Sequence, residues 1–153
     1  MPSSGSKAAK IISVTNQKGG VGKTTTTINL AAALSQLKKK VLIIDLDPQG
    51  NASTGLGVEV EDRELSTYEF LVEGAPLEKV AMETEISGLS IVPATIDLSS
   101  ADIDLISNEK RSHLLHEALR KKQENKKKYD FILIDCPPSV SYTHLRAHET
   151  HLN

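Results

Sequence analysis

Runs of apolar residues, each followed by a polar loop, are the first feature of this chain. Residues 11–14, 41–45 and 131–135 are short, nearly continuous apolar runs rich in β-branched side chains, and residues 89–93 form a similar run. Such runs are typical of strands that are covered on both faces of a sheet. Glycine or aspartate follows or ends three of the runs, which predicts loops at the carboxyl ends of the strands.

The segment between the first two runs has a helical pattern. From Thr24 onward, Leu30, Ala33, Leu34 and Leu37 recur at intervals of three and four residues, which predicts a helix with an apolar face. Residues 38–40 are lysines, which suit the negative end of a helix dipole. Strand, helix and strand together predict one right-handed βαβ unit with parallel strands.

Two more helices are predicted further along the chain. Ser66 and Glu69 have the spacing of a capping box that opens a short helix, and Gly74 marks its end. Residues 112–122 place Leu115 and Leu119 on one helical face. The chain is therefore predicted to have an α/β fold with a parallel sheet flanked by helices, a class that binds ligands at the carboxyl ends of its strands.

Composition and charge exclude or disfavour several classes of protein. The chain has 153 residues and a net charge of −2, which disfavours a chain-wide electrostatic grip on nucleic acid. Cys136 is the only cysteine, so an intrachain disulfide and a CxxC metal pair are both excluded. Residues 1–8 have the small, polar character of a flexible tail, and no apolar run approaches the roughly 20 residues of a membrane span. We expect a soluble cytoplasmic protein.

A glycine-rich loop follows the first predicted strand. It reads Lys18-Gly19-Gly20-Val21-Gly22-Lys23-Thr24. Glycines let the backbone curl so that its N–H groups point at phosphate oxygens, Lys23 can reach the β- and γ-phosphates, and the Thr24 hydroxyl can ligate Mg²⁺. The first glycine of the general P-loop pattern is replaced by Gln17. Lys18 is either a solvated loop lysine or a functional addition, and the residues alone leave both open.

Three aspartates lie at or just after the ends of predicted strands. Asp45 ends the second strand, and Asp47 follows two residues later, so both carboxylates can face the same side. Asp135 ends the last apolar run in the manner of a Walker B aspartate, which holds the metal through water. Each could instead cap a turn. Their combination with the phosphate loop favours a site for ATP and Mg²⁺.

These motifs together resemble the ParA/Soj partition ATPases, a branch of the ParA/MinD family of P-loop NTPases. The loop resembles the family's deviant Walker A, Asp45-Leu46-Asp47-Pro48-Gln49-Gly50-Asn51 resembles its switch I, and Asp135-Cys136-Pro137-Pro138-Ser139 resembles its Walker B and the start of switch II. The resemblance covers residues 9–139. MinD itself fits less well, because the run from Asp47 to Asn51 is the partition type.

The resemblance implies an ATPase that forms a homodimer when it binds ATP. In this family Lys18 would contact the partner subunit's ATP, Asp47 would position the attacking water, and Thr24, Asp45 and Asp135 would support Mg²⁺. The nucleotide would lie on the loop and the two threonines that follow it, Thr24 and Thr25. A ParB-like protein would stimulate hydrolysis, and the dimer would bind DNA without sequence specificity in chromosome or plasmid segregation. Transcriptional control or the positioning of other cargo is the alternative that residues 1–139 leave open.

Residues 140–153 do not continue the family's pattern. We expect this tail to be foreign to the family, because it resembles a translated adapter sequence, and we expect the α/β fold to be incomplete at its C-terminal end. Whether this chain alone hydrolyses ATP is left open. His144, His148 and His151 have a helical spacing that could form a metal site, but no acidic or thiol ligand is evidently arranged with them, and a short polar tail should fray.

Overall fold

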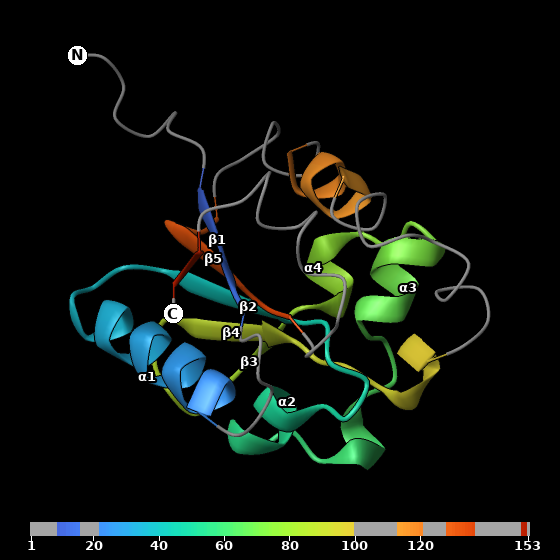
Figure 1. Cartoon of the computed structure of the whole chain (residues 1–153), viewed down its shortest axis with the longest axis horizontal. Helices are drawn as coiled ribbons and strands as arrows, with labels where there is room; N and C mark the ends of the chain where they lie inside the picture. The colour runs from blue at the N-terminus through green and yellow to red at the C-terminus, as the bar shows by residue number, and fades with distance from the viewer. Residues whose placement is uncertain (1–8, 16–21, 100–112, 121–127, 137–150, 153) are drawn as a thin grey trace.

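A six-stranded sheet forms the centre of the computed structural model, which describes residues 9–15, 22–99, 113–120, 128–136 and 151–152 (Figure 1). The strands are β1 (Lys10–Val14), β2 (Val41–Asp45), β3 (Met82–Glu83), β4 (Leu89–Val92), β5 (Phe131–Asp135) and β6 (His151–Leu152). Their order across the sheet is β3-β4-β2-β5-β1-β6, and only β3 pairs in an antiparallel direction. The predicted α/β class and the four predicted strands are confirmed.

The register of the central strands determines where the polar residues meet. β5 lies between β2 and β1, and Asp135 is the pairing partner of both Asp45 and Val14. Backbone hydrogen bonds continue one residue beyond the strands, from Leu46 N to Asp135 O and from Cys136 N to Val14 O. The carboxyl ends of three parallel strands therefore lie at one edge of the sheet, as this fold class requires.

Helices cover both faces of the sheet (Figure 1). They are α1 (Gly22–Gln36), α2 (Asn51–Gly55), α3 (Thr67–Val72), α4 (Leu77–Val80) and a helix over residues 113–120, with short 3-10 turns at Val60–Asp62 and Ile96–Ser99. Alternate residues of β2 lie on opposite faces of the sheet. Leu42 and Ile44 pack with α3, α4 and Leu119, whereas Val41 and Ile43 pack with α1 and α2. Each such buried side chain contributes about 1.5–3 kcal/mol, which explains the uninterrupted apolar runs.

α1 confirms the predicted helix, but its most buried face is not its apolar one. Its buried residues follow a spacing of four and are Lys23, Thr27, Ala31 and Ser35. Of the predicted apolar face, Leu30 and Leu34 are only partly buried, Ala33 is exposed, and Leu37 is 68% exposed beyond the end of the helix. Leu30 and Leu34 pack at the edge of the core cluster, whereas small and polar side chains form the most buried face of the helix.

The end of α1 is a Schellman motif made with a lysine. The amides of Lys38 and Lys39 donate to the carbonyl oxygens of Ser35 and Leu34 at 3.0 and 3.1 Å. Lys38 has a φ of 67°, the left-handed conformation that this motif requires and that normally favours glycine. The helix therefore ends at Gln36, and the predicted lysine cluster forms the cap and the exposed turn that leads into β2.

Two helix predictions are confirmed. Ser66 caps α3 with a complete capping box that uses Glu69, and the chain turns at Gly74 with a φ of 72°. Residues 113–120 are helical and bury Leu115 and Leu119.

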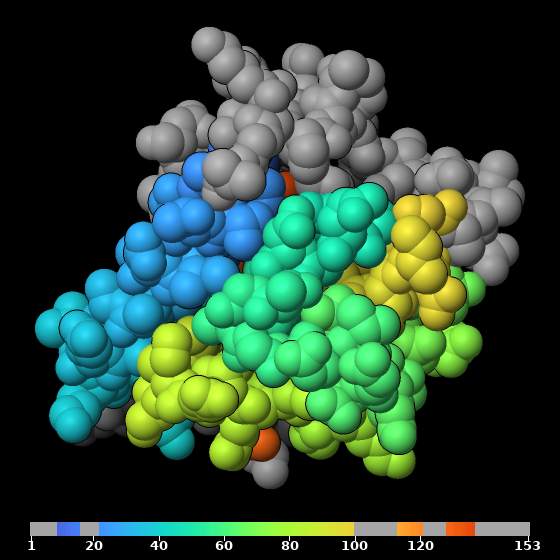
Figure 2. All heavy atoms as spheres, turned by 90° about the horizontal axis from the view of Figure 1, so that it is seen from below, coloured from blue at the N-terminus to red at the C-terminus, as the bar shows by residue number. Residues whose placement is uncertain are grey.

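The sequence analysis missed α2, α4, β3 and β6, which have five, four, two and two residues. α2 lies beside α1 (Figure 2), where a Cβ added to Gly55 would lie 2.7 Å from the Cδ1 of Ile28.

Candidate nucleotide-binding site

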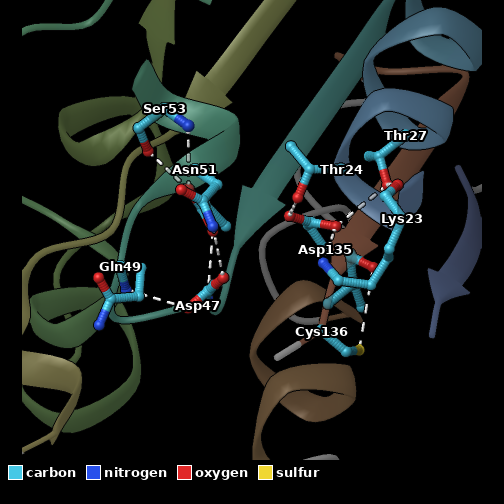
Figure 3. A network of polar contacts seen from close by, with 11 residues as sticks. Lys23, Thr24, Thr27, Asp47, Gln49, Asn51, Ser53, Asp135 and Cys136 are labelled. Carbon is cyan, nitrogen blue, oxygen red and sulfur yellow. Dashed lines mark hydrogen bonds and ion pairs between the residues drawn. The ribbon is translucent and has the colours of Figure 1, made fainter. Parts of the chain in front are cut away.

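The first turns of α1 lie against the carboxyl end of β5. Lys23 Nζ forms an ion pair with Asp135 Oδ1, and both side chains are almost completely buried. The hydroxyl of Thr24 donates to Asp135 Oδ2 at 3.2 Å, and that of Thr27 donates to Asp135 Oδ1 at 3.1 Å. Figure 3 shows the three side chains of α1 grouped around the Asp135 carboxylate.

This cluster follows from helix geometry and from the cost of burying charge. Lys23 and Thr27 are four residues apart, so they lie on the same face of α1, which is the face that contacts the sheet. A buried carboxylate is stable only when it is paired and hydrogen-bonded, and Asp135 has one ammonium and two hydroxyl partners. The site therefore joins a cation, two hydroxyls and a carboxylate in a pre-organised group.

Asp45 is buried one strand away from Asp135. Its Oδ2 accepts hydrogen bonds from the backbone N–H of Ser53 at 3.0 Å and from the Ser53 hydroxyl at 2.7 Å, and its Oδ1 accepts from Asp47 N at 3.1 Å. Burial raises the pKa of the Asp45 carboxyl to about 6, the hydrogen bonds from Ser53 oppose that rise, and the nearby charge of Asp135 adds to it. Asp45 therefore joins the end of β2 to α2.

Asp47 lies in the loop between β2 and α2. Its Oδ1 accepts from the backbone N–H of Gln49 at 3.0 Å, and its Oδ2 accepts from the side chain of Asn51 at 3.4 Å. Gly50 has a φ of 67° and donates its N–H to Asp47 O. In Figure 3 the Asp47 carboxylate faces Gln49 and Asn51 and lies apart from the group around Asp135.

The structure thus brings some predicted site residues together and separates others. Lys23 and Thr24 contact Asp135, Asp45 pairs with Asp135 across the sheet, and Asp47 is buried nearby without touching that group. Gly22 opens α1, and Thr25 is exposed on it. The remaining predicted loop residues, Lys18, Gly19, Gly20 and Val21, lie outside the described residues, as do His144 and His148 and the side chain of His151.

Sequence reasoning missed three polar residues of this region. Thr27 is fully buried against Asp135, Ser53 is fully buried against Asp45, and Arg63 is 8% exposed beside α2. The spacing of four from Lys23 could have indicated Thr27. Ser53 and Arg63 lie in segments without hydrophobic periodicity, so their burial depends on tertiary contacts.

The oxygen ligands at this edge of the sheet fit Mg²⁺. In the part of the chain that is described, no three His, Cys, Asp or Glu side chains converge on one point as a metal cage would require. Magnesium seldom uses such a cage, because it retains several waters and binds one or two carboxylates together with substrate phosphates. The Thr24 hydroxyl and the Asp135 carboxylate are oxygen donors of this kind, and they lie in contact.

Comparison with known proteins identifies the family. A family model described as an AAA domain matches residues 9–149. The chain belongs to this family. The match extends beyond Ser139, where the sequence motifs end. The predicted start of a foreign tail at residue 140 stays a prediction.

Within the AAA-domain family the chain resembles the Soj and ParA proteins. It is 46% identical over 138 residues to the sporulation initiation inhibitor protein Soj of Bacillus subtilis, a region that is 90% of this chain and 53% of Soj. It is 44% identical over 138 residues to the chromosome partitioning protein ParA of Myxococcus xanthus, a region that is 90% of this chain and 48% of that protein. The chain thus spans about half the length of the curated relatives that it matches.

A solved structure with a bound ATP analog and magnesium has the same fold. Cobyrinic acid a,c-diamide synthase from Mycobacterium smegmatis, solved with a bound ATP analog and magnesium, matches with a TM-score of 0.75 and 36% identity over 86% of this chain and 52% of that one. The predicted P-loop fold and the resemblance to ParA/Soj proteins are confirmed. Among the described helices, none has the length and apolar character needed to span a membrane.

Proposed function

We propose that this chain carries the phosphate-binding half of a partition-type ATPase that binds and hydrolyses ATP. The observation that carries the proposal is the contact between the start of α1 and the end of β5. There Lys23, Thr24 and Thr27 all reach the buried Asp135. A cation, a hydroxyl and a carboxylate at the carboxyl edge of a parallel sheet are the parts that phosphoryl transfer needs.

Each part has a role in this proposal. The backbone N–H groups of residues 18–25 bind phosphate oxygens, and Lys23 exchanges its contact with Asp135 for the β- and γ-phosphates. Thr24 and Asp135 would hold Mg²⁺. Asp45 adds negative charge one strand away. The metal, when bound, neutralises charge that develops on the phosphates.

Hydrolysis in this proposal depends on Asp47. Asp47 is 6% exposed, and its carboxylate accepts hydrogen bonds from Gln49 and Asn51, which hold it in one position without a nucleotide. We assign it the positioning of the attacking water. We assign Lys18 a contact with the partner subunit's nucleotide in an ATP-bound homodimer.

The similarity to Soj and ParA supports a role in chromosome or plasmid partition. The proposal therefore includes a ParB-like stimulating protein, sequence-independent binding of DNA, and a cytoplasmic location at the nucleoid. The Soj and ParA relatives are about twice as long as this chain, so we propose these properties for the chain only as part of a protein of that length.

Substitution of Lys23 tests nucleotide binding. Lys23→Ala should weaken the binding of Mg·ATP to the full chain by about 100-fold or more, because a charge-assisted contact with two phosphates is lost. Lys79→Ala removes an exposed lysine from α4 and should leave the affinity unchanged. Titration with a fluorescent ATP analogue measures both, and circular dichroism verifies that each variant is folded. Equal affinities of the Lys23 variant and the parent would overturn the proposal.

Substitution of Asp47 tests the hydrolytic step. Asp47→Ala should bind Mg·ATP with the affinity of the parent and lose turnover, because it alters the water-positioning group and leaves the phosphate contacts intact. Release of inorganic phosphate, measured over many hours, follows turnover. Turnover of the variant at the rate of the parent would remove Asp47 from the mechanism.

A further inference from the structure

Arg63 is a buried cation for which no carboxylate partner is found among the described residues. Its side chain is 8% exposed and makes four hydrogen bonds, all to uncharged oxygens. Burial of a guanidinium is costly unless its donors are satisfied. Its position therefore requires a structural reason beyond ion pairing.

The hydrogen bonds of Arg63 join three segments. Nε and Nη2 donate to the carbonyl oxygen of Val58 at 3.2 and 2.7 Å, and Nη2 also donates to Thr54 Oγ1 at 2.9 Å. Nη1 donates to the carbonyl oxygen of Ala94, just after β4, at 3.0 Å. Planar, fixed donors that point in different directions are particular to arginine. Arg63 thus connects the end of α2 and the loop behind it to the loop after β4.

A second set of contacts connects the same residue, Ala94, to the candidate nucleotide-binding site. The N–H of Ala94 donates to Ser53 Oγ at 3.1 Å, so Ala94 is bound through its carbonyl by Arg63 and through its amide by Ser53. Ser53 in turn donates twice to Asp45, and Asp45 accepts the backbone N–H of Asp47. A continuous hydrogen-bonded path therefore leads from Arg63 to the backbone of Asp47.

Arg63 also contacts the Asp47 loop directly through Gly50. A Cβ built on Gly50 would lie 2.4 Å from Arg63 Nη1 and 3.3 Å from Ala94 O. The guanidinium therefore fills the space beside the glycine, where the loop adopts its left-handed conformation.

We propose that Arg63 is a positioning residue for Asp47: it fixes α2 and the Gly50 turn against the loop after β4, so that the Asp47 loop keeps one conformation. The proposal rests on the proposed function in one respect only, namely that ATP turnover depends on this conformation. The physical part, the order of the loop, can be measured without any ATPase activity.

Amide hydrogen exchange of the full chain tests the order of the loop. Arg63→Met keeps the length of the side chain and removes every donor, and Arg120→Met is the matched control on an exposed arginine. The amides of Gly50, Ser53 and Ala94 should exchange about tenfold faster in Arg63→Met, whereas amides of β2 and β5 should keep the protection of the parent. Arg120→Met should match the parent throughout.

A second variant separates the effect of the positive charge from that of the hydrogen-bond geometry. Arg63→Lys retains the cation, but one ammonium cannot reach all three acceptors, so the same amides should again exchange faster than in the parent. Parental exchange in Arg63→Met, complete rescue by Arg63→Lys, or an equal loss of protection in the strands would each overturn the proposal.

Steady-state kinetics then test the consequence for turnover. Arg63→Met should lower kcat about tenfold with the KM for ATP within about twofold of the parent, because the contacts of Lys23 and Thr24 are intact. A parent chain that does not hydrolyse ATP would contradict the proposed function while the exchange result still decides the role of Arg63. An unchanged kcat in Arg63→Met, beside an active parent, would overturn the positioning role alone.

Discussion

The buried carboxyl of Asp45 should make the stability of the fold depend on pH in a direction opposite to that of most paired carboxylates. Burial raises its pKa from 3.8 to about 6, so the folded chain binds a proton that the unfolded chain releases between those values. Its contribution to stability is therefore fully present below about pH 4 and is lost as the pH rises through about 6. The full shift corresponds to about 3 kcal/mol.

Replacement of Asp45 by asparagine isolates this effect. The amide side chain cannot titrate, so the difference in unfolding free energy between the parent and Asp45→Asn should change by about 2–3 kcal/mol from about pH 7 to about pH 4, in favour of the parent at low pH. The loss of one hydrogen bond, from Asp47 N or from Ser53, lowers the stability of the variant by a similar amount at every pH and cancels from this difference. Titration of other carboxylates cancels in the same way.

Urea unfolding followed by circular dichroism gives both free energies at each pH, in buffer that contains a chelator so that no divalent cation occupies the site. Asp97→Asn, on an exposed aspartate, controls for the general effect of removing one negative charge. Parallel pH profiles for the parent and Asp45→Asn would refute the reasoning, since they would mean that the Ser53 contacts offset the cost of burial.

Two further predictions concern left-handed backbone positions. Lys38→Gly should stabilise the fold by about 0.5–1 kcal/mol in urea unfolding, because Lys38 holds a φ of 67° in the cap of α1, whereas Lys39→Gly should give no gain. Gly50→Ala should destabilise it by more than about 2 kcal/mol, because an added Cβ meets Arg63 Nη1 as well as an unfavourable φ. Gly57→Ala, with a φ of 84° and open space around it, should cost only about 1 kcal/mol, and equal losses at both glycines would contradict the contact with Arg63.

Hydrophobic runs and turn chemistry predicted most of the fold. β2 and β5 are buried on both faces, so their apolar sequence reports the environment directly. The capping box at Ser66 is equally local, since its hydrogen bonds join residues two and three apart. α2 and β3 have five and two residues, and they exist because neighbouring elements fix them, which no local pattern records.

The candidate site was predictable where a motif lies at the end of a strand. Asp45 and Asp135 end β2 and β5, and the parallel register alone brings their backbones together. The supporting residues were not predictable, because Ser53 and Arg63 act through Ala94, which lies 41 residues from Ser53 and 31 from Arg63 along the chain. Contacts of that range depend on the finished fold.

The most buried face of α1 is not its apolar one, and the physical cause also explains the site. Hydropathy favours the leucines, yet the face in contact with the sheet carries Lys23 and Thr27, which are buried because Asp135 offers them a charged partner. Small residues continue that stripe at Ala31 and Ser35, so the helix axis can approach the strands closely. Once the phosphate-loop motif directs Lys23 toward the sheet, a spacing of four identifies the whole stripe. In a helix whose first turn is functional, the motif therefore predicts the buried face better than hydrophobic periodicity does.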